Sequence, residues 1–244
     1  MTESGAASDW KLVLLGSAVL MHGQKIVQVP EKLFALAAYL VLSGTNGVAR
    51  RTQIAELLWD NATTSQGSVN LRQLLMRLRK RQAEIGIELL AADDHNVWLN
   101  EGQIQIDLRE LQSLARDLTA ASAVSLAELY RGDLLEGCSP TGSELDEWLL
   151  VHRTRLRDDV GRALLQGLER SDIDLSSEQI RVVADSLLRI DPYQEIAYRA
   201  LMRVNALQGR IDRVRSTFEA CRRKLKSELG VSPESKTVQL YLHL

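Results

Sequence analysis

The 244-residue sequence predicts a mainly α-helical protein with two domains, and small β-sheets only in the first. Two observations lead to this prediction. Runs of β-forming residues separated by turn residues are confined to about the first hundred positions, whereas helical periodicity alone continues after Asp107. The 45% share of hydrophobic residues is enough for a packed core in each part. We therefore expect one domain over residues 10–106 and another over residues 107–244.

Three short strands and a helix are expected at the start of the first domain. The strands are predicted over residues 11–15, 17–21 and 25–29, with a hairpin turn at His22 and Gly23. Pro30 then stops the last strand, and apolar residues at helical spacing predict a helix over residues 31–43. Residues 44–47 read as a loop.

Two more helices and a second hairpin complete this domain. Thr52 is expected to cap a short helix over residues 53–58, and a polar linker spans residues 63–67. A longer helix is predicted over residues 66–84 and closed by Gly86, before a hairpin of residues 88–90 and 96–99. Short helix, loop, long helix and hairpin is the order of a winged helix-turn-helix, whose long helix enters the DNA major groove.

The long helix lies in a strongly basic segment. The chain carries a formal net charge of −2, but residues 50–81 hold seven Lys or Arg against two acids, an excess of +5. Local charge of this kind governs affinity for DNA. On a helical wheel, Leu71, Leu75, Leu78 and Ile85 form the core side with Leu74 at its edge, opposite the polar side chains.

The polar face supplies the candidate DNA contacts. Arg pairs with guanine, and Asn or Gln pairs with adenine, so the candidate base contacts are Asn70, Gln73 and Arg77. The candidate phosphate contacts are Arg50, Arg51, Arg72, Arg79, Lys80 and Arg81. The alternative is a basic face that only meets solvent, and Arg79 could instead pair with an acid inside the domain.

The second hairpin, the expected wing, gives a weaker signal for DNA. Its tip holds Asp93 and Asp94, which phosphates repel, while His95 and Asn96 could reach the minor groove or a sugar. A wing with a purely structural role is therefore an equal alternative. The two cysteines, Cys138 and Cys221, belong to no cysteine or histidine cluster, and we expect two free thiols with Cys221 packed as an apolar residue.

The second domain is predicted to be a helical repeat. Helices are expected over residues 107–118, 125–130, 144–170, 177–190, 193–207, 211–229 and 234–244. Helix pairs joined by short loops, with Pro192 and Gly209 at repeat-like positions, indicate a tetratricopeptide-like arrangement. Residues 131–143 form a connection, and residues 171–176 form a break. Trp148 is interpreted as a core anchor rather than a ligand-stacking residue.

Several strings resemble the SARP family of bacterial transcriptional activators. In the first half they are ARRTQIAELLWD (49–60), SVNLRQLLMRLRKRQ (68–82), NVWLN (96–100) and IQIDLREL (104–111). The second half is similar to the family's bacterial transcriptional activator domain, through LYRGDLLEG (129–137), ELDEWLLVHRTRLRD (144–158), RIDPYQEIAYRALMRVNALQGR (189–210) and RKLKSELGVSPES (223–235).

The resemblance implies a winged helix that binds direct repeats upstream of promoters, and a protein that contacts RNA polymerase. Arg77 matches a family position used for base contact, and Arg79 one used for phosphate contact or internal pairing. The wing departs from the family pattern, because Val97-Trp98-Leu99 stands where a Gly-rich turn and Tyr-Arg-Leu are usual. This departure puts the DNA role of the wing in doubt.

Catalysis and membrane insertion are not expected. The four histidines are scattered, no nucleotide-binding, metal-binding or nucleophile motif occurs, and we expect no enzyme activity, metal or cofactor. The longest apolar run has ten residues (33–42), too few to span a bilayer core of about 30 Å, and a secretory signal is lacking. We expect a cytoplasmic activator that binds double-stranded DNA as a homodimer. The alternative is a protein-interaction scaffold whose winged helix serves for docking.

Overall fold

The computed structural model describes residues 9–43, 47–138, 142–170 and 175–244. The chain divides into two compact units, one of residues 1–110 and 132–155 and the other of residues 111–131 and 156–244. Most of the expected loop at 44–47 (residues 44–46), most of the break at 171–176 (residues 171–174) and part of the connection at 131–143 (residues 139–141) lie outside the described residues.

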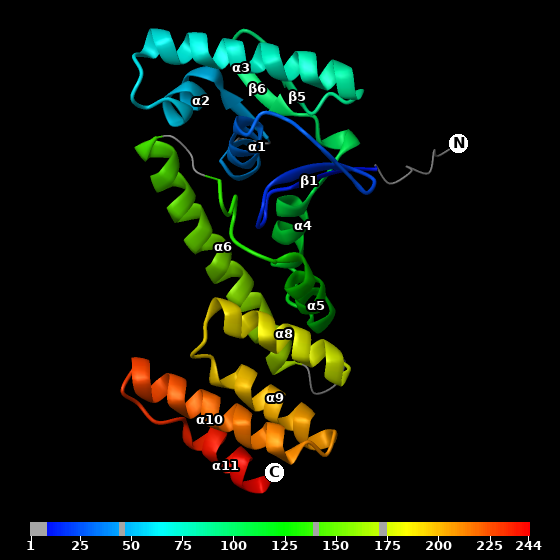
Figure 1. Ribbon diagram of the computed structural model, residues 1–244, viewed down its shortest axis with the longest axis vertical. Coiled ribbons are helices and arrows are strands. Elements are labelled where there is room, and N and C mark those ends of the chain that lie inside the picture. The colour runs from blue at the N-terminus through cyan, green and yellow to red at the C-terminus, as the bar shows by residue number, and fades with distance from the viewer. Residues whose placement is uncertain (1–8, 44–46, 139–141, 171–174) are drawn as a thin grey trace, which may run out of the picture. The chain divides into compact units, whose positions relative to one another are not determined.

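A four-stranded sheet opens the first unit (Figure 1). Its strands lie in the order β3 (Lys25–Val27), β2 (Val19–His22), β1 (Trp10–Val13) and β7 (Gln105–Ile106). The first three are antiparallel neighbours and match the three predicted strands, with the turn at Gly23 in the left-handed region at φ +58°. The sequence analysis missed β7, which pairs in parallel with β1.

The second sheet has the order β4 (Val48–Arg50), β6 (Asn96–Leu99) and β5 (Leu90–Ala92). Strands β5 and β6 form the predicted hairpin, the wing. Strand β4 was not predicted. It pairs antiparallel with β6, so that Arg50 lies opposite Asn96. The short 3-10 helix η1 (Glu101–Gln103) then leads from the wing to β7.

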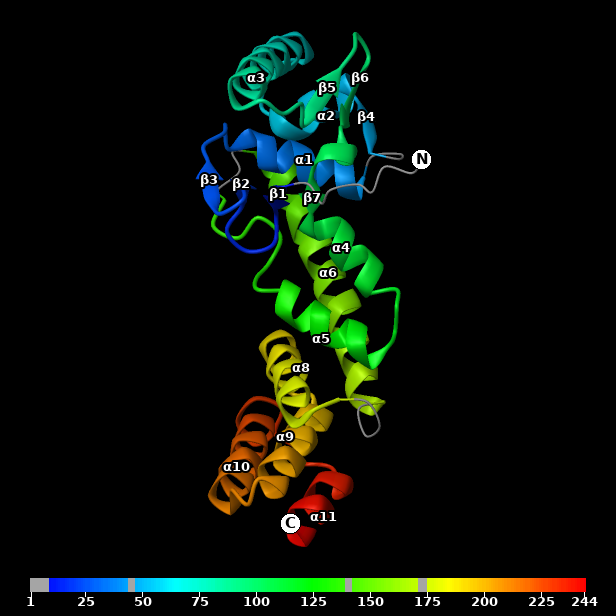
Figure 2. The same cartoon turned by 90° about the vertical axis from the view of Figure 1, so that its right-hand side faces the viewer.

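Three helices, α1 (Lys32–Leu42), α2 (Arg51–Leu58) and α3 (Thr64–Ile85), complete the predicted winged helix-turn-helix (Figure 2). The prediction that Thr52 caps the second helix is wrong. Helix α2 begins at Arg51, two residues before the predicted start, and the backbone N–H of its N-cap residue Arg50 donates to Gln53 Oε1 at 3.3 Å. The fully buried side chains of this unit include Leu12, Leu20, Leu36, Leu40, Ile54, Leu58, Leu71 and Leu78.

Residues 132–155 pack with the first unit although the sequence analysis assigned them to the second domain. The backbone N–H of Leu135 donates to the carbonyl of Leu14 at 2.8 Å. Arg153 donates from Nε and Nη2 to the carbonyls of Leu134 and Leu135, each at 2.8 Å. The guanidinium therefore fixes the connection beside the first half of α6 (Ser143–Glu169).

The second unit is helical. Its elements are the end of α4 (Asp107–Leu114), α5 (Ala120–Leu129), the second half of α6, α8 (Ser177–Ile190), α9 (Glu195–Leu207), α10 (Ile211–Glu228) and α11 (Ser235–His243). Helix α8 has the predicted bounds. Ser176 caps it by accepting from the backbone N–H of Gln179 at 3.3 Å. In the described residues, no helix combines the length and apolar character needed to cross a membrane.

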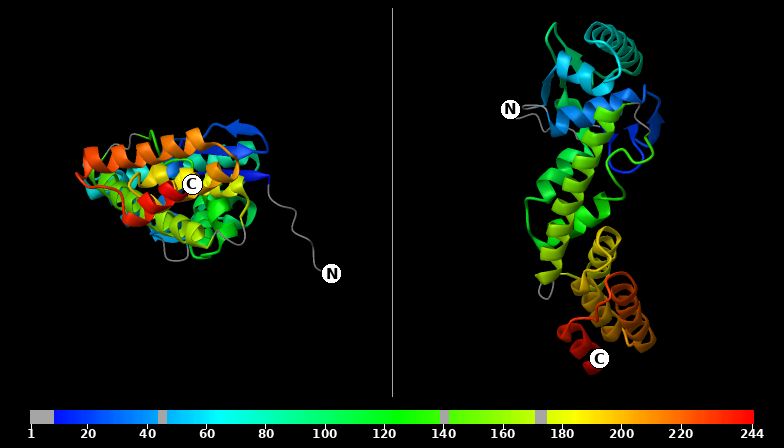
Figure 3. Two further views of the ribbon diagram at one scale, coloured as in Figure 1. Left: turned by 90° about the horizontal axis from the view of Figure 1, so that it is seen from below. Right: turned by 90° about the vertical axis from the view of Figure 1, so that its left-hand side faces the viewer.

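Helices α8, α9, α10 and α11 lie side by side in chain order (Figure 3). The turn between α9 and α10 contains Gly209 at φ +69°, a conformation that glycine adopts without steric cost. Two apolar clusters join α9 to α10, one around Tyr198, Cys221 and Leu225 and the other around Met202, Val214 and Phe218. Both cysteines are free, and burial raises the pKa of the Cys221 thiol to about 12.

Candidate nucleic-acid interface

Helix α3 has well-defined ends. Thr63, at its N-cap, accepts a hydrogen bond from the backbone N–H of Gln66 at 3.3 Å, and Gly86 ends the helix at φ +77°. The predicted polar linker over 63–67 is therefore largely the cap and first turn of this helix. Near the N-terminus of α3, Gly67 is buried, and a Cβ on this residue would meet Ala55 of α2 at 3.6 Å. This distance is ordinary van der Waals contact, so the packing of α2 on α3 does not itself require a glycine.

The buried face of α3 differs in detail from the predicted one. Leu71, Leu74 and Leu78 are buried, whereas Leu75, predicted as core, is half-buried. Gln82 is also buried and bonds Leu90 of β5 twice: it accepts from the N–H at 2.6 Å and donates to the carbonyl at 3.0 Å. These bonds join α3 to the wing. Gln82 lies one turn after Leu78 on the core face, and a polar residue at such a position indicates a buried hydrogen bond.

The candidate base contacts have different surroundings. Gln73 and Arg77 are exposed on the face opposite the leucines. Asn70 is half-buried, and its Oδ1 accepts a hydrogen bond from Gln66 Nε2 at 3.1 Å. Met76, one residue before Arg77, is 67% exposed. An exposed arginine, amide and methionine along one helix suit contact with base edges in the major groove.

Four cations of α3 face solvent without internal partners. In the described parts of the chain, the side chains of Arg72, Arg77, Arg79 and Lys80 form no hydrogen bond or ion pair. The alternative predicted for Arg79 was an ion pair with an acid inside the domain. Among the described residues, no acid forms an ion pair with Arg79. Four unneutralised cations on one helix favour a polyanion as the ligand.

Arg81 differs from these four residues because the fold already uses it. Its Nε donates to the carbonyl of Gln28 at 2.8 Å, and its Nη1 forms an ion pair with Glu84 Oε2 at 3.1 Å. The guanidinium therefore ties α3 to the chain that follows β3. Any phosphate contact by Arg81 would have to share these hydrogen bonds.

The two arginines before α3 lie beside the wing. Arg50 is exposed at the end of β4. Arg51 is half-buried: its backbone N–H donates to the carbonyl of His95, and its Nη1 donates to the carbonyl of Asp93, both at 2.9 Å. Strand β4, absent from the sequence analysis, thus sets the position of both arginines.

Asp93, one of the two acids at the wing tip, has a structural role. Asp93 Oδ1 accepts from the backbone N–H of His95 at 2.8 Å and of Asn96 at 2.6 Å. Hydrogen bonds from Asn96 and His95 hold the pKa of Asp93 below its usual value. Asp93 therefore closes the turn. His95 remains exposed and Asn96 half-buried, so both predicted wing contacts lie at the surface or close to it.

A groove of about 280 Å³ runs between α3 and β5. Arg51, Arg72 and Arg79 line it from two different helices, and Glu88 is the one acid in its lining. Three guanidinium groups that converge beside a basic helix would attract phosphate oxygens, because arginine matches their geometry with paired donors.

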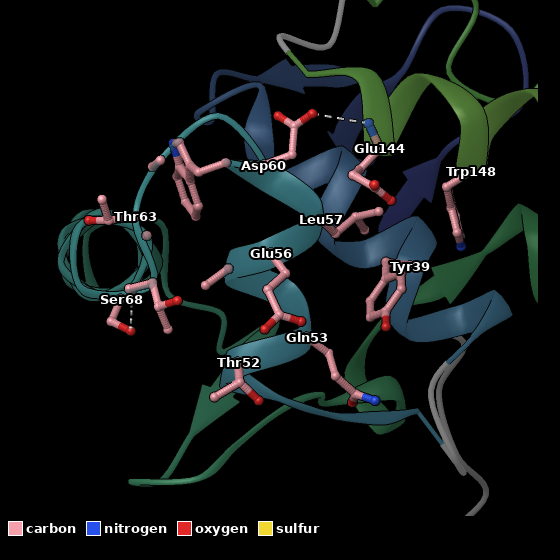
Figure 4. A pocket seen from close by; sticks show the side chains of 15 residues that line it. Tyr39, Thr52, Gln53, Glu56, Leu57, Asp60, Thr63, Ser68, Glu144 and Trp148 are labelled. Carbon is pink, nitrogen blue, oxygen red and sulfur yellow. Dashed lines mark hydrogen bonds between the residues drawn. The ribbon is translucent and has the colours of Figure 1, made fainter.

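A larger pocket, of about 560 Å³, lies elsewhere in the same unit (Figure 4). Glu56, Asp60 and Glu144 are in its lining, which contains no Lys, Arg or His. Asp60 accepts from Ser143 Oγ at 2.6 Å and from the N–H of Glu144 at 3.2 Å. The hydroxyl bond is the main cause that lowers the pKa of Asp60. The first unit thus has an acidic surface as well as a basic one.

Trp148 forms part of this pocket, and its prediction as a core anchor is wrong. The indole is half-buried, its Nε1 donates to Ser43 Oγ at 2.9 Å, and its ring lies 5.7 Å from that of Tyr39. Leu145 and Leu149, on the same helix, are the buried residues instead. A tryptophan at a pocket wall keeps one polar end satisfied and part of its ring accessible.

Residues 100–244 match the family model of the bacterial transcriptional activator domain. The structure is similar to that of Mycobacterium tuberculosis EmbR in complex with a low affinity phosphopeptide, at 18% sequence identity and a TM-score of 0.61. That match covers 97% of this chain and 65% of the EmbR chain, so this chain spans less than two thirds of the EmbR chain. No curated protein sequence matches.

The structural similarity confirms the predicted fold, a winged helix-turn-helix with small sheets and a helical repeat after it. It shows the fold alone, since the identity is low. The family match is more informative because it covers more than half of the chain. On this evidence the chain belongs to the bacterial transcriptional activator domain family.

Proposed function

We propose that the protein is a sequence-specific DNA-binding activator that inserts α3 into the major groove at tandem promoter sites. The observation that carries this proposal is the set of four cations on α3 with no internal partner in the described residues. Two of them, Arg72 and Arg79, line a groove together with Arg51. We assign DNA binding to residues 10–106 and assembly to residues 107–244, with Asn70, Gln73 and Arg77 as the base contacts.

The remaining cations position the duplex. Arg72, Arg79 and Lys80 contact phosphates, together with Arg50 and Arg51 beside the wing and Arg81 at the end of α3. Exposed His95 and neighbouring Asn96 reach the adjacent minor groove or sugar. The protein acts in the cytoplasm by binding, without a catalytic step or a cofactor.

Fluorescence anisotropy over a salt series tests DNA binding. With about six phosphate contacts, affinity should fall roughly a thousandfold between about 50 and 200 mM salt, because bound phosphates release their counterions. Selection from random DNA would supply the specific site and show whether it is a direct repeat. Absent or salt-insensitive binding would refute the proposal.

We further propose that the DNA-bound form is a homodimer that engages RNA polymerase. The acidic pocket of Figure 4 supports a second contact surface, since its charge is opposite to that of α3. Sedimentation of the protein on DNA with one or two sites measures the stoichiometry. Transcription reconstituted from purified polymerase tests activation, and Glu144→Gln should reduce activation without changing DNA affinity.

The second candidate is a protein-interaction scaffold in which the winged helix serves for docking. The acidic pocket and the acids of the wing tip favour it, because neither attracts DNA. A protein partner recovered from nuclease-treated lysate, together with the absence of a DNA complex, would support the scaffold. Sequence-selective DNA binding would reject it.

A further inference from the structure

A second cationic site lies in the helical unit, among α8, α9 and α10. It is a pocket of about 470 Å³. Arg181 lines it from α8, Arg213 from α10, and Arg210 from the residue before α10, while the amide of Asn205 belongs to α9. Side chains from three helices therefore converge on one cavity, which differs from a row of charges along a single solvated face.

The pocket has a buried polar base. Asn205 is 4% exposed. Its Oδ1 accepts from Arg181 Nη2 at 3.2 Å, and its Nδ2 donates to Thr217 Oγ1 at 3.5 Å, the long end of the hydrogen-bond range. Arg181 Nη2 also lies 3.5 Å from Gln208 Oε1. One guanidinium is thus held in place by α9, so its orientation is set before a ligand arrives.

The other two arginines are uncommitted. Arg210 and Arg213 are exposed, and in the described residues their side chains form no hydrogen bond or ion pair. Ser216 and Thr217 follow one turn later on α10 in the same lining. Ser216 Oγ donates to the carbonyl of Arg213 at 3.1 Å, whereas Thr217 Oγ1 accepts from Asn205 and keeps its own hydroxyl proton. The side chains of Arg210 and Arg213 therefore retain all of their hydrogen-bond donors for a bound ligand.

One acid opposes this charge. Asp185 lies one turn after Arg181 on α8 and lines the same pocket. Burial raises the pKa of Asp185, while Arg181 and Arg189 act in the opposite direction. With three arginines and one aspartate, the lining carries a formal charge of +2 when Asp185 is ionised.

We propose that this pocket binds a small organic phosphate monoester. A phosphate monoester carries a charge of about −2 at neutral pH and offers three acceptor oxygens, which suits a +2 lining with three guanidinium groups and the hydroxyl of Thr217. The cavity is also larger than one phosphate group, so there is room for the organic part of the molecule. The site lies in the helical unit and does not depend on the proposed contacts of α3 with DNA.

Titration calorimetry on the full chain, at constant ionic strength, tests the site with three probes: phenyl phosphate, inorganic phosphate and benzoate. We expect one site per chain for phenyl phosphate, weaker binding of inorganic phosphate because it leaves the rest of the cavity unfilled, and the weakest binding for benzoate, a monoanion. Benzoate binding as tight as phenyl phosphate binding would overturn the assignment to phosphate.

Variants locate the site. Arg213→Gln should weaken phenyl phosphate binding about tenfold, the expected loss for one hydrogen bond to a charged group. Asp185→Asn should tighten binding, because it removes the competing carboxylate. Arg222→Gln, whose guanidinium is paired with Glu219 outside this lining, is the matched control and should bind as the wild type does.

Arg210→Gln combined with Arg213→Gln should abolish measurable binding. Both side chains are exposed, so circular dichroism and thermal unfolding should show an unchanged fold. Equal affinity of this double variant and the wild type would overturn the proposal. DNA binding measured on the same variant in the absence of phosphate should be unaltered, which separates this site from the function of α3.

Discussion

Helices α3 and α10 are both rich in arginine and lysine, but they differ in how many of these side chains form ion pairs. Helix α3 carries five Lys or Arg and one acid, and its ion pair joins Arg81 to Glu84 near the C-terminus. Helix α10 carries six Lys or Arg and three acids. Two of its cations are paired one turn away: Arg222 with Glu219 at 2.7 Å and Lys224 with Glu228 at 2.6 Å.

The position of the acids, more than the number of basic residues, therefore decides how many cations of a basic helix remain available to an anionic ligand. An acid three or four residues from a cation neutralises it locally. Arg72, Arg77 and Arg79 of α3 have no acid at these distances, and Glu84, four residues after Lys80, forms its ion pair with Arg81 instead. These four cations therefore stay available to a polyanion. Arg213 in the first turn of α10 and Arg210 just before that helix are also unpaired in the described residues, and they line the pocket that we assign to a phosphate ester.

The largest expected effects come from the buried faces that hold both helices. Phe218 of α10 stacks on Tyr241 with ring centroids 4.1 Å apart, and Leu78 of α3 is 2% exposed. Phe218→Ala should lower the free energy of unfolding by about 3–5 kcal/mol and Leu78→Ala by about 2–5 kcal/mol, measured by urea denaturation. A change below about 1 kcal/mol in either would mean that the helix is not anchored by this face.

The next largest effect is on DNA affinity, and it should differ between the basic faces of α3 and α10. Arg77→Ala should weaken binding to the selected DNA site by about 1–3 kcal/mol, and it should relax specificity at one base position. Arg222→Ala, the control in α10, should leave DNA affinity unchanged because Glu219 already neutralises it. Fluorescence anisotropy on specific and scrambled duplexes gives both values, and an equal loss in the two variants would erase the distinction between the helices.

A smaller effect is expected for a phosphate contact. Lys80→Ala should weaken specific and non-specific DNA binding alike, and it should reduce the slope of log affinity against log salt by about 1. Lys224→Ala, whose ammonium is paired with Glu228, should leave that slope as in the wild type. Loss of specificity in Lys80→Ala would instead make Lys80 a base contact.

The smallest effect concerns the acids themselves. Glu219→Gln should change the free energy of unfolding by about 0.5 kcal/mol or less, since exposed ion pairs on helices contribute little. Glu84→Gln should be equally mild in stability but should strengthen non-specific DNA binding, because it frees Arg81. If Glu84→Gln had no effect on DNA affinity, Arg81 would be a structural residue alone.

The order and type of most elements could be predicted from local sequence patterns. Helical spacing of apolar residues and Gly86 at a helix end are such patterns, and they predicted the bounds of α3 and α8 within two residues. The basic character of α3 and the exposure of Arg77 also follow from local spacing. Residues four apart lie on the same face of a helix, whereas residues two apart lie on opposite faces.

The remaining features depend on tertiary contacts. Strands β4 and β7 do not belong to a local hairpin, unlike the similarly short β3 and β5, and they form because β6 and β1, distant in sequence, supply hydrogen-bond partners. Leu74 rather than Leu75 is buried, Arg51 and Arg81 are held by carbonyl groups, and Trp148 lines a pocket, for the same reason: burial and pairing depend on which surface a neighbouring element covers.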